Sequence, residues 1–62
     1  MDGNWEYVLE KQAYENELLV NPNDTDVLFD LACLLDNRLS DYSGARKCYE
    51  RILEIDPYAF RG

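Results

Sequence analysis

The sequence predicts an all-α fold in which three short helices share one core. Apolar residues recur at three- and four-residue steps in three separate segments, and no segment alternates apolar and polar residues as a strand would. Proline or a polar stretch separates each segment from the next. Because 62 residues leave room for one hydrophobic core, we expect one domain over residues 1–62.

The first helix is expected over residues 4–20. Good helix formers dominate from Trp5 to Val20, and neither glycine nor proline interrupts them. Asn4 is the expected N-cap, and Pro22 ends the helix because its ring disfavours helical geometry at the preceding residue. We expect the apolar side of this helix to contain Trp5, Val8, Leu9, Ala13, Tyr14 and Leu18.

A second helix is expected to begin at Asp24 or Thr25, either of which is a suitable cap. A third helix should begin near Asp41, with Gly44 in its first turn, and end before Pro57. The predicted stripe of the second helix is Leu28, Leu31, Ala32 and Leu35. That of the third is Ala45, Cys48, Tyr49, Ile52 and Ile55, with outward ion pairs Lys47–Glu50 and Arg51–Glu54.

The charge is strongly acidic and unevenly distributed. Thirteen acidic and six basic residues give a net charge of −7, which disfavours direct binding to nucleic acid or to an anionic membrane. Residues 1–36 carry nine acids and one base, whereas residues 37–62 carry four acids and five bases. This asymmetry permits the acidic part of one copy to face the basic helix of another, although a solvated surface explains it as well.

Several chemical functions are disfavoured by composition. The chain has no histidine, so Cys33 and Cys48 have no imidazole base, and we expect them to be reduced packing residues in the cytoplasm or nucleus. We expect no metal site and no cofactor, since two thiols do not complete a structural zinc site. The sequence has neither a signal peptide nor an 18-residue apolar run, so we expect no membrane association. These observations favour a non-catalytic protein.

The first and third helices repeat each other at an offset of 35 residues. The offset superposes five identical pairs: Tyr7 and Tyr42, Tyr14 and Tyr49, Glu15 and Glu50, Leu18 and Leu53, Pro22 and Pro57. Conservative pairs at 20 and 55 and at 21 and 56 extend the match. A period of this length is typical of solenoids, in which each unit buries its apolar face against a neighbour.

The repeated unit resembles the tetratricopeptide repeat (TPR), a helix–turn–helix of 34 residues. Its first-helix spacing occurs at Leu28, Leu31, Ala32 and Leu35, and its second-helix spacing at Ala45, Tyr49 and Pro57. The resemblance implies one full repeat over 25–57, with helix 4–20 as the second helix of a preceding repeat and 58–62 as a tail. It further implies an α-hairpin solenoid fragment with right-handed superhelical stacking.

The match to the TPR pattern has departures. Leu28 and Ala32 occupy its tryptophan and glycine positions, and one extra residue lies between Leu35 and Ala45. The run over residues 45–53 also resembles the half-a-TPR variant of RNA-processing scaffolds, although that variant usually has aromatic residues in its first helix.

Two glutamates in the first helix also depart from the repeat. Glu10 and Glu17 stand where the repeat wants small apolar residues, so at least one must face water or a cation. This is how a terminal capping helix behaves, because the end of a solenoid needs a polar outer face. The other interpretation is that basic residues of a second molecule meet this stripe, namely Arg46, Lys47 or Arg51.

The resemblance implies a protein-interaction module whose ligand groove is lined by the second helix. We expect Asp26, Asp30 and Cys33 to be exposed there and to favour a basic or apolar segment. One and a half repeats leave apolar ends open, so we also expect a homo-oligomer or a subunit of a larger assembly. Trp5, Tyr7, Tyr58 and Phe60 are candidates for the covered patch. The alternatives are a structural filler subunit without a groove, for example in an RNA-processing complex, and a piece of a longer array.

Overall fold

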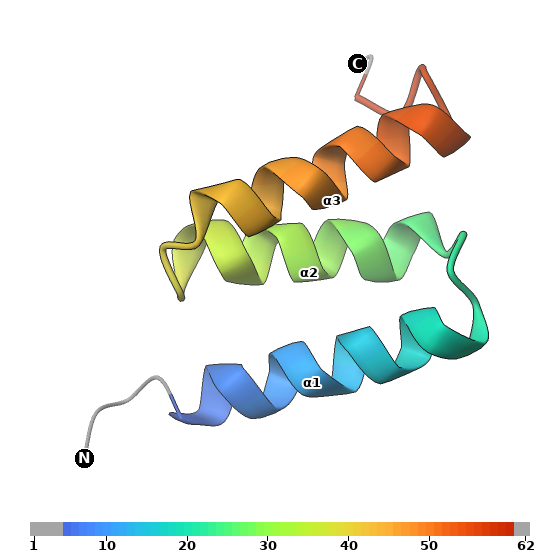
Figure 1. The fold of residues 1–62 in the computed structure, drawn as a ribbon. Coiled ribbons are helices and arrows are strands. Elements are labelled where there is room, and N and C mark those ends of the chain that lie inside the picture. Colours follow the sequence, from blue (N-terminus) through green and yellow to red (C-terminus); the bar gives the residue numbers. More distant parts are fainter. Residues whose placement is uncertain (1–4, 61–62) are drawn as a thin grey trace.

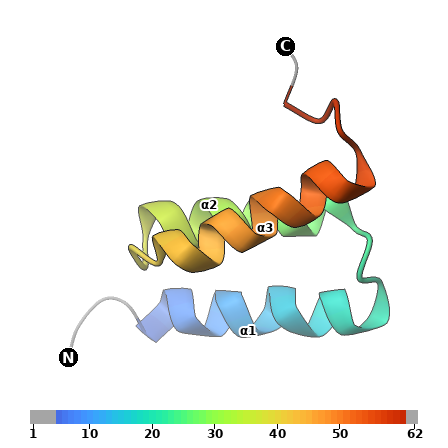
Figure 2. The same cartoon turned by 45° about the horizontal axis from the view of Figure 1, so that its top comes forward.

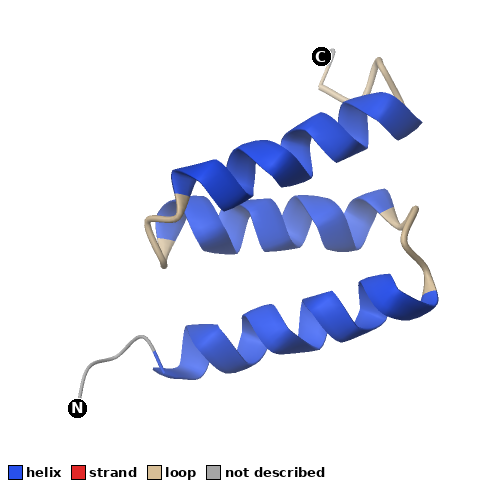
Figure 3. Cartoon of the chain, viewed as in Figure 1, coloured by secondary structure: helices blue, strands red, loops and turns tan. Residues whose placement is uncertain are grey.

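The computed structural model describes residues 5–60 and contains three α-helices joined by two short turns (Figure 3). The helices are α1 (Trp5–Val20), α2 (Thr25–Asn37) and α3 (Tyr42–Ile55). No strand occurs among the described residues, so the all-α prediction is confirmed for that part of the chain. The predicted cap Asn4 lies outside the described residues.

Helix α2 is the central element of the fold. Consecutive helices run antiparallel, and α2 packs against both α1 and α3 (Figure 1). The three helices do not lie in one plane. When the view is turned by 45°, α3 lies in front of α2 while α1 remains below both (Figure 2). Among the described residues, no helix combines the length and apolar character needed to cross a bilayer.

Aspartate caps begin both α2 and α3. The Asp24 carboxylate accepts hydrogen bonds from the backbone N–H groups of Asp26 and Val27, at 3.1 and 3.3 Å. The Asp41 carboxylate accepts one from the backbone N–H of Gly44, at 3.0 Å. Each cap satisfies a donor that has no partner within the helix, and both caps lie where the sequence predicted them.

The turn between α2 and α3 is tight. Ser40 has φ 54°, a left-handed conformation, and the Asp41 N–H donates to the Leu35 carbonyl at 2.7 Å. A Cβ at Gly44 would lie 2.7 Å from Asp41 Oδ2 and 3.1 Å from Leu35 Cδ1. Glycine therefore allows the start of α3 to lie directly against its own cap and against α2.

The buried core comes from α2 and α3. The predicted α2 stripe is buried as expected, and Leu34 is buried as well, because α2 has a helix on two sides. From α3, Ala45 and Ile52 are buried, while Cys48 and Tyr49 are half-buried. Ile55 was predicted to be part of the α3 core but is exposed at the end of the helix.

Helix α1 packs through a narrower strip than the sequence predicted. Tyr7, Tyr14 and Leu18 pack against the core, and Val8 is half-buried. The predicted core residues Trp5, Leu9 and Ala13 are exposed, so that part of the expected stripe is wrong. The reason is that α1 packs against α2 alone, and one neighbouring helix covers only one side of it.

The last described residues fold back over the end of α3. Asp56 accepts a hydrogen bond from the Tyr58 N–H at 3.1 Å, and Phe60 packs against Tyr49 and Phe29. Its ring centroid lies 5.5 Å from that of Tyr49 and 6.0 Å from that of Phe29. These contacts form a three-ring cluster between α2, α3 and the final turn.

Candidate binding surface on helix α2

One side of α2 is largely exposed between α1 and α3, and we call it the open face. It contains Asp26, Asp30, Cys33 and Asn37, which follow one another at steps of four, three and four residues. The two aspartates and Asn37 are exposed, and Cys33 is half-buried. The three residues predicted to line a groove thus share one face of one helix.

A pocket of about 330 Å³ lies at the N-terminal end of the open face. We call it the acidic pocket, because Asp26 and Asp56 both line it beside the rings of Phe29 and Phe60. Carboxylates next to aromatic faces suit a lysine or arginine side chain, which gains ion pairing and cation–π attraction together. Two of the predicted partner-binding residues, Asp26 and Phe60, therefore meet here.

A second pocket, of about 600 Å³, lies at the C-terminal end of the open face. We call it the Tyr7 pocket; Tyr7 and Glu10 come from α1, and Cys33, Leu34 and Asn37 come from α2. The Arg38 guanidinium carbon lies 5.4 Å from the centroid of the Tyr7 ring, within cation–π range. Tyr7 and Cys33, both predicted site residues, line this pocket together.

The electrostatic field beside the open face is negative. The pKa of Tyr14 is raised, first by loss of solvent and then by the carboxylates of Asp30, Glu10 and Glu17. The pKa of Tyr49 is also raised, first by loss of solvent and then by the nearby Cys33, which shares a hydrogen bond with it. Both phenols therefore remain protonated and neutral at neutral pH, and they add no charge to that of the carboxylates.

The predicted terminal aromatic residues do not form one patch. Tyr7 is half-buried against the core, and Phe60 belongs to the three-ring cluster at the opposite end of α2. Trp5 is exposed at the start of α1, far along the molecule from the final turn that contains Tyr58 (Figure 1). The start of α1 and the turn after α3 are separated because three antiparallel helices place them at opposite ends of the helix axes (Figure 1).

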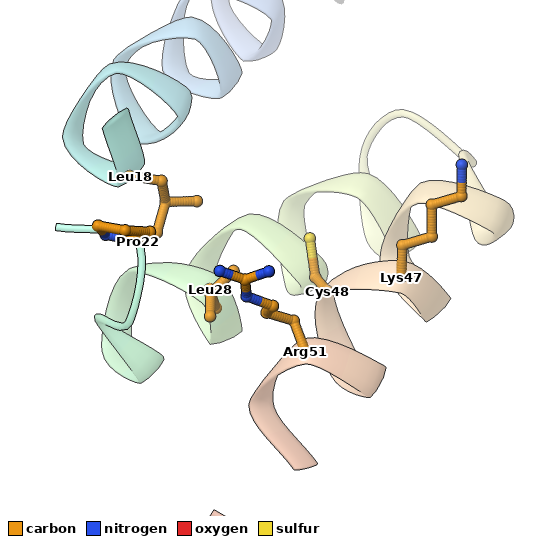
Figure 4. A pocket seen from close by; sticks show the side chains of 6 residues that line it. All are labelled: Leu18, Pro22, Leu28, Lys47, Cys48 and Arg51. Atoms are coloured by element: carbon orange, nitrogen blue, oxygen red, sulfur yellow. The ribbon is translucent and has the colours of Figure 1, made fainter. Parts of the chain in front are cut away.

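A pocket on the other side of α2 was not anticipated from the sequence. It has a volume of about 350 Å³, and its apolar wall is formed by Leu18, Pro22 and Leu28 (Figure 4). Lys47, Cys48 and Arg51 line it from α3, and Arg51 reaches toward Leu28. Burial, followed by the charges of Glu15 and Asp41, raises the pKa of the Cys48 thiol, so the thiol stays protonated and weakly nucleophilic.

The remaining predicted signature residues belong to the packed core or follow the helix ends. Leu31 and Leu35 belong to the buried cluster, to which Tyr14 and Tyr49 are packed, and Pro22 and Pro57 follow the ends of α1 and α3. The sequence alone did not indicate three residues of these pockets: Phe29 and Asp56 in the acidic pocket, and Arg38 over the Tyr7 ring. The spacing of Phe29 three residues after Asp26 was the one available signal, because Asp56 and Arg38 lie outside the helices.

In residues 5–60, no group of three or more cysteine, aspartate or glutamate side chains is arranged to hold a metal ion. No family model, no curated protein and no solved structure matches this chain.

Proposed function

We propose that the chain is a non-catalytic protein-interaction module of TPR type that binds a basic or apolar segment of a partner protein across the open face of α2. The observation that carries this proposal is the acidic pocket, in which Asp26 and Asp56 lie beside Phe29 and Phe60. The proposal includes right-handed stacking of the helices, as in a solenoid.

The chemistry of the face supports a basic or apolar ligand over an acidic one. Asp26 and Asp30 are exposed on the open face, and Glu10 adds a third carboxylate at its α1 edge. A cationic side chain is attracted by these groups, whereas an acidic segment would be repelled. Tyr7 at one end and Phe29 and Phe60 at the other supply apolar surface, so alternating basic and apolar residues in a ligand find complementary contacts.

We also propose that the chain works as a homo-oligomer or as a subunit of a larger assembly. Large apolar side chains are exposed outside the open face, among them Leu19 and Val20 at the end of α1. A small protein gains stability when such surface is covered. Both cysteines are free, which suits the reducing cytoplasm or nucleus.

The test is a charge reversal on the open face. The double variant Asp26→Lys/Asp30→Lys should lose binding to a lysine- and leucine-containing probe peptide, measured by fluorescence anisotropy in low salt. The same variant should gain affinity for a matched peptide in which glutamate replaces lysine, because the field of the face is reversed. Circular dichroism checks that the helical fold is retained.

The matched control carries the same charge change elsewhere. Glu6→Lys/Glu54→Lys alters two exposed carboxylates on α1 and α3, and it should bind the basic probe nearly as the parent chain does. If both double variants weaken binding equally, the interaction is a general charge effect and the open face is not the site.

A second candidate function is that of a filler subunit in a multiprotein complex, an RNA-processing complex included, without a ligand groove of its own. The observation that favours it is the spread of exposed apolar residues over several surfaces, including Leu19, Tyr42 and Leu53. In that case the charge reversal at Asp26 and Asp30 leaves partner binding unchanged. Sedimentation that shows a well-folded monomer at micromolar concentration would argue against self-association.

A further inference from the structure

The pocket between α1, α2 and α3 that Figure 4 shows combines apolar and cationic side chains, and we call it the cationic pocket. Leu18 and Pro22 come from the end of α1 and the turn after it, and Leu28 comes from α2. On α3, Lys47 and Arg51 are four residues apart and share one face of the helix. A bound group would therefore meet both aliphatic carbon and positive charge.

The two cations of this pocket have no partner within residues 5–60. The side chains of Lys47 and Arg51 are exposed and form no ion pair, hydrogen bond or ring contact there. The other basic residues of that part of the chain are engaged: Lys11 pairs with Glu15, Arg46 pairs with Glu50, and Arg38 lies over the Tyr7 ring. Two unpaired cations thus line one apolar pocket of a chain whose net charge is −7.

The carboxylates that act on this pocket already have partners. The charges of Glu15 and Asp41 reach the thiol of Cys48, which lines the pocket between the two cations. Glu15 lies 3.5 Å from the Lys11 ammonium, and Asp41 accepts the hydrogen bond of the Gly44 N–H that caps α3. Lys47 and Arg51 therefore remain available to an anion from outside the chain.

The size and shape of the pocket suit a protein segment. Its volume of about 350 Å³ is near the lower end of the range of roughly 300–1,000 Å³ that ligand sites have. It is an open hollow between three helices and not an enclosed cavity. One or two side chains of a segment laid across it would be covered, whereas a free fatty acid would keep much of its chain in water.

We propose that the cationic pocket binds a short segment of a partner protein in which an acidic residue stands beside leucine or a similar aliphatic residue. The carboxylate would form charge-assisted hydrogen bonds with Lys47 and Arg51. The aliphatic side chain would cover Leu18, Pro22 and Leu28 and remove apolar surface from water. The acidic open face of α2 favours a basic segment, so the two surfaces of the chain select opposite charges.

An NMR titration with a designed peptide tests the proposal, because it detects weak binding and locates it. The ¹⁵N-labelled full chain is titrated with the peptide GSELLESG. We expect saturable shifts of the amides of Leu18, Leu28 and residues 47–51, and unchanged amides at residues 33–37 of the open face. The peptides GSKLLKSG and GSESSESG should each bind this pocket about tenfold or more weakly, since one lacks the carboxylates and the other the aliphatic chains.

Two variants of equal charge test the cations. Lys47→Gln/Arg51→Gln should weaken binding of GSELLESG by about tenfold or more, because it removes the charges of the pocket. The matched control Lys11→Gln/Arg46→Gln also removes one lysine and one arginine, but outside the pocket, and should bind nearly as the parent chain does. Amide dispersion checks the fold of each variant, and the three peptides on the parent chain decide the case if a variant does not fold.

Four outcomes would overturn the proposal. The first is the absence of saturable shifts at the pocket, and the second is equal weakening by the two double variants. The third is binding of sodium octanoate to the same amides more tightly than the peptide, which would make a free aliphatic acid the ligand. The fourth is a concentration-dependent shift of these amides without peptide that Lys47→Gln/Arg51→Gln abolishes, which would make a second copy the occupant. None of these outcomes affects binding of a basic probe to the open face of α2, so each proposal can fail alone.

Discussion

Helices α1 and α3 carry the same sequence motif, yet they contribute differently to the core. Two residues of α3, Ala45 and Ile52, are buried, whereas none of the described α1 residues is. The residues 35 positions earlier are Glu10 and Glu17, both exposed. Two equivalent helices therefore present opposite chemistry on the same side.

The difference shows that a repeated motif determines where a helix forms but not which of its sides is buried. Both helices form, and both end just before an Asx–Pro pair, because helix propensity and proline punctuation are local properties. Which side of each helix is buried depends on single residues: small or branched apolar groups on α3, and carboxylates on α1. The side of α1 that carries the carboxylates is exposed, and among the described helices α1 contacts α2 alone.

The largest expected effect comes from Ile52, which is 2% exposed. Ile52→Ala should lower the free energy of unfolding by about 2–5 kcal/mol, because it removes buried methyl groups and leaves a cavity. The matched change on α1, Glu17→Ala, should stay within about 0.5 kcal/mol, since the side chain is exposed. Urea denaturation followed by circular dichroism measures both; equal losses would contradict the asymmetry between the helices.

A smaller effect is expected at the start of α3. Asp41→Ala removes the carboxylate that accepts the Gly44 N–H bond at 3.0 Å and should cost about 1 kcal/mol. The equivalent residue on α1 is Glu6, which lies inside the first turn of that helix. Glu6→Ala should cost only about 0.3 kcal/mol, through loss of its interaction with the helix dipole. If thermal unfolding showed that Glu6→Ala lowers stability as much as Asp41→Ala does, the two helices would begin in equivalent ways.

Alkaline pH should weaken the fold gradually. The folded-state pKa values of Tyr14, Tyr49 and Cys48 are all raised, chiefly by burial, above their ordinary values of 10.0, 10.0 and 9.0. The folded chain therefore holds these protons more tightly than the unfolded chain does. Their stabilising contribution is fully present below pH 9 and is lost as pH rises through the folded-state pKa values.

Two phenylalanine variants separate the contributions of the helices. Tyr49→Phe on α3 and Tyr14→Phe on α1 each remove one titrating phenol, so each should flatten the decline of unfolding free energy between about pH 9 and 11. Urea titrations at several pH values measure the decline. Stability that rises with pH over this range would contradict the assignment.

Much of the helical layout could be predicted from the sequence, because it depends on local signals. Asp24 and Asp41 cap helices where their spacing to the apolar stripes indicated, and the stripe from Leu28 to Leu35 is buried. The side of α1 that packs against the core was harder to predict. Trp5 and Leu9 fit a helical stripe as well as Tyr7 does, and only the position of α2 decides between them.

The candidate surface could be predicted only in part. The open face of α2 follows from helix periodicity, since Asp26, Asp30 and Cys33 lie off the apolar stripe. The pocket that joins Asp26 to Phe60 depends on how the chain turns back after Pro57, a contact between residues more than thirty positions apart. No local pattern in the sequence determines that Asp26 and Phe60 line the same pocket.

The smallest expected effects concern two equivalent ion pairs, Lys11–Glu15 at 3.5 Å and Arg46–Glu50 at 3.2 Å. The described residues form these pairs in place of the predicted Lys47–Glu50 and Arg51–Glu54. Lys11→Ala and Arg46→Ala each break a pair one turn apart on an exposed helix surface, so each should cost only about 0.2–0.5 kcal/mol. The loss should diminish in 1 M NaCl, because salt screens exposed charges. Here α1 and α3 should behave alike, since each pair joins two side chains one helical turn apart that remain in contact with solvent. If Lys11→Ala proved several times more damaging than Arg46→Ala, the lysine would contribute through its packing beside α2, and the two ion pairs would be equivalent in sequence position but not in energy.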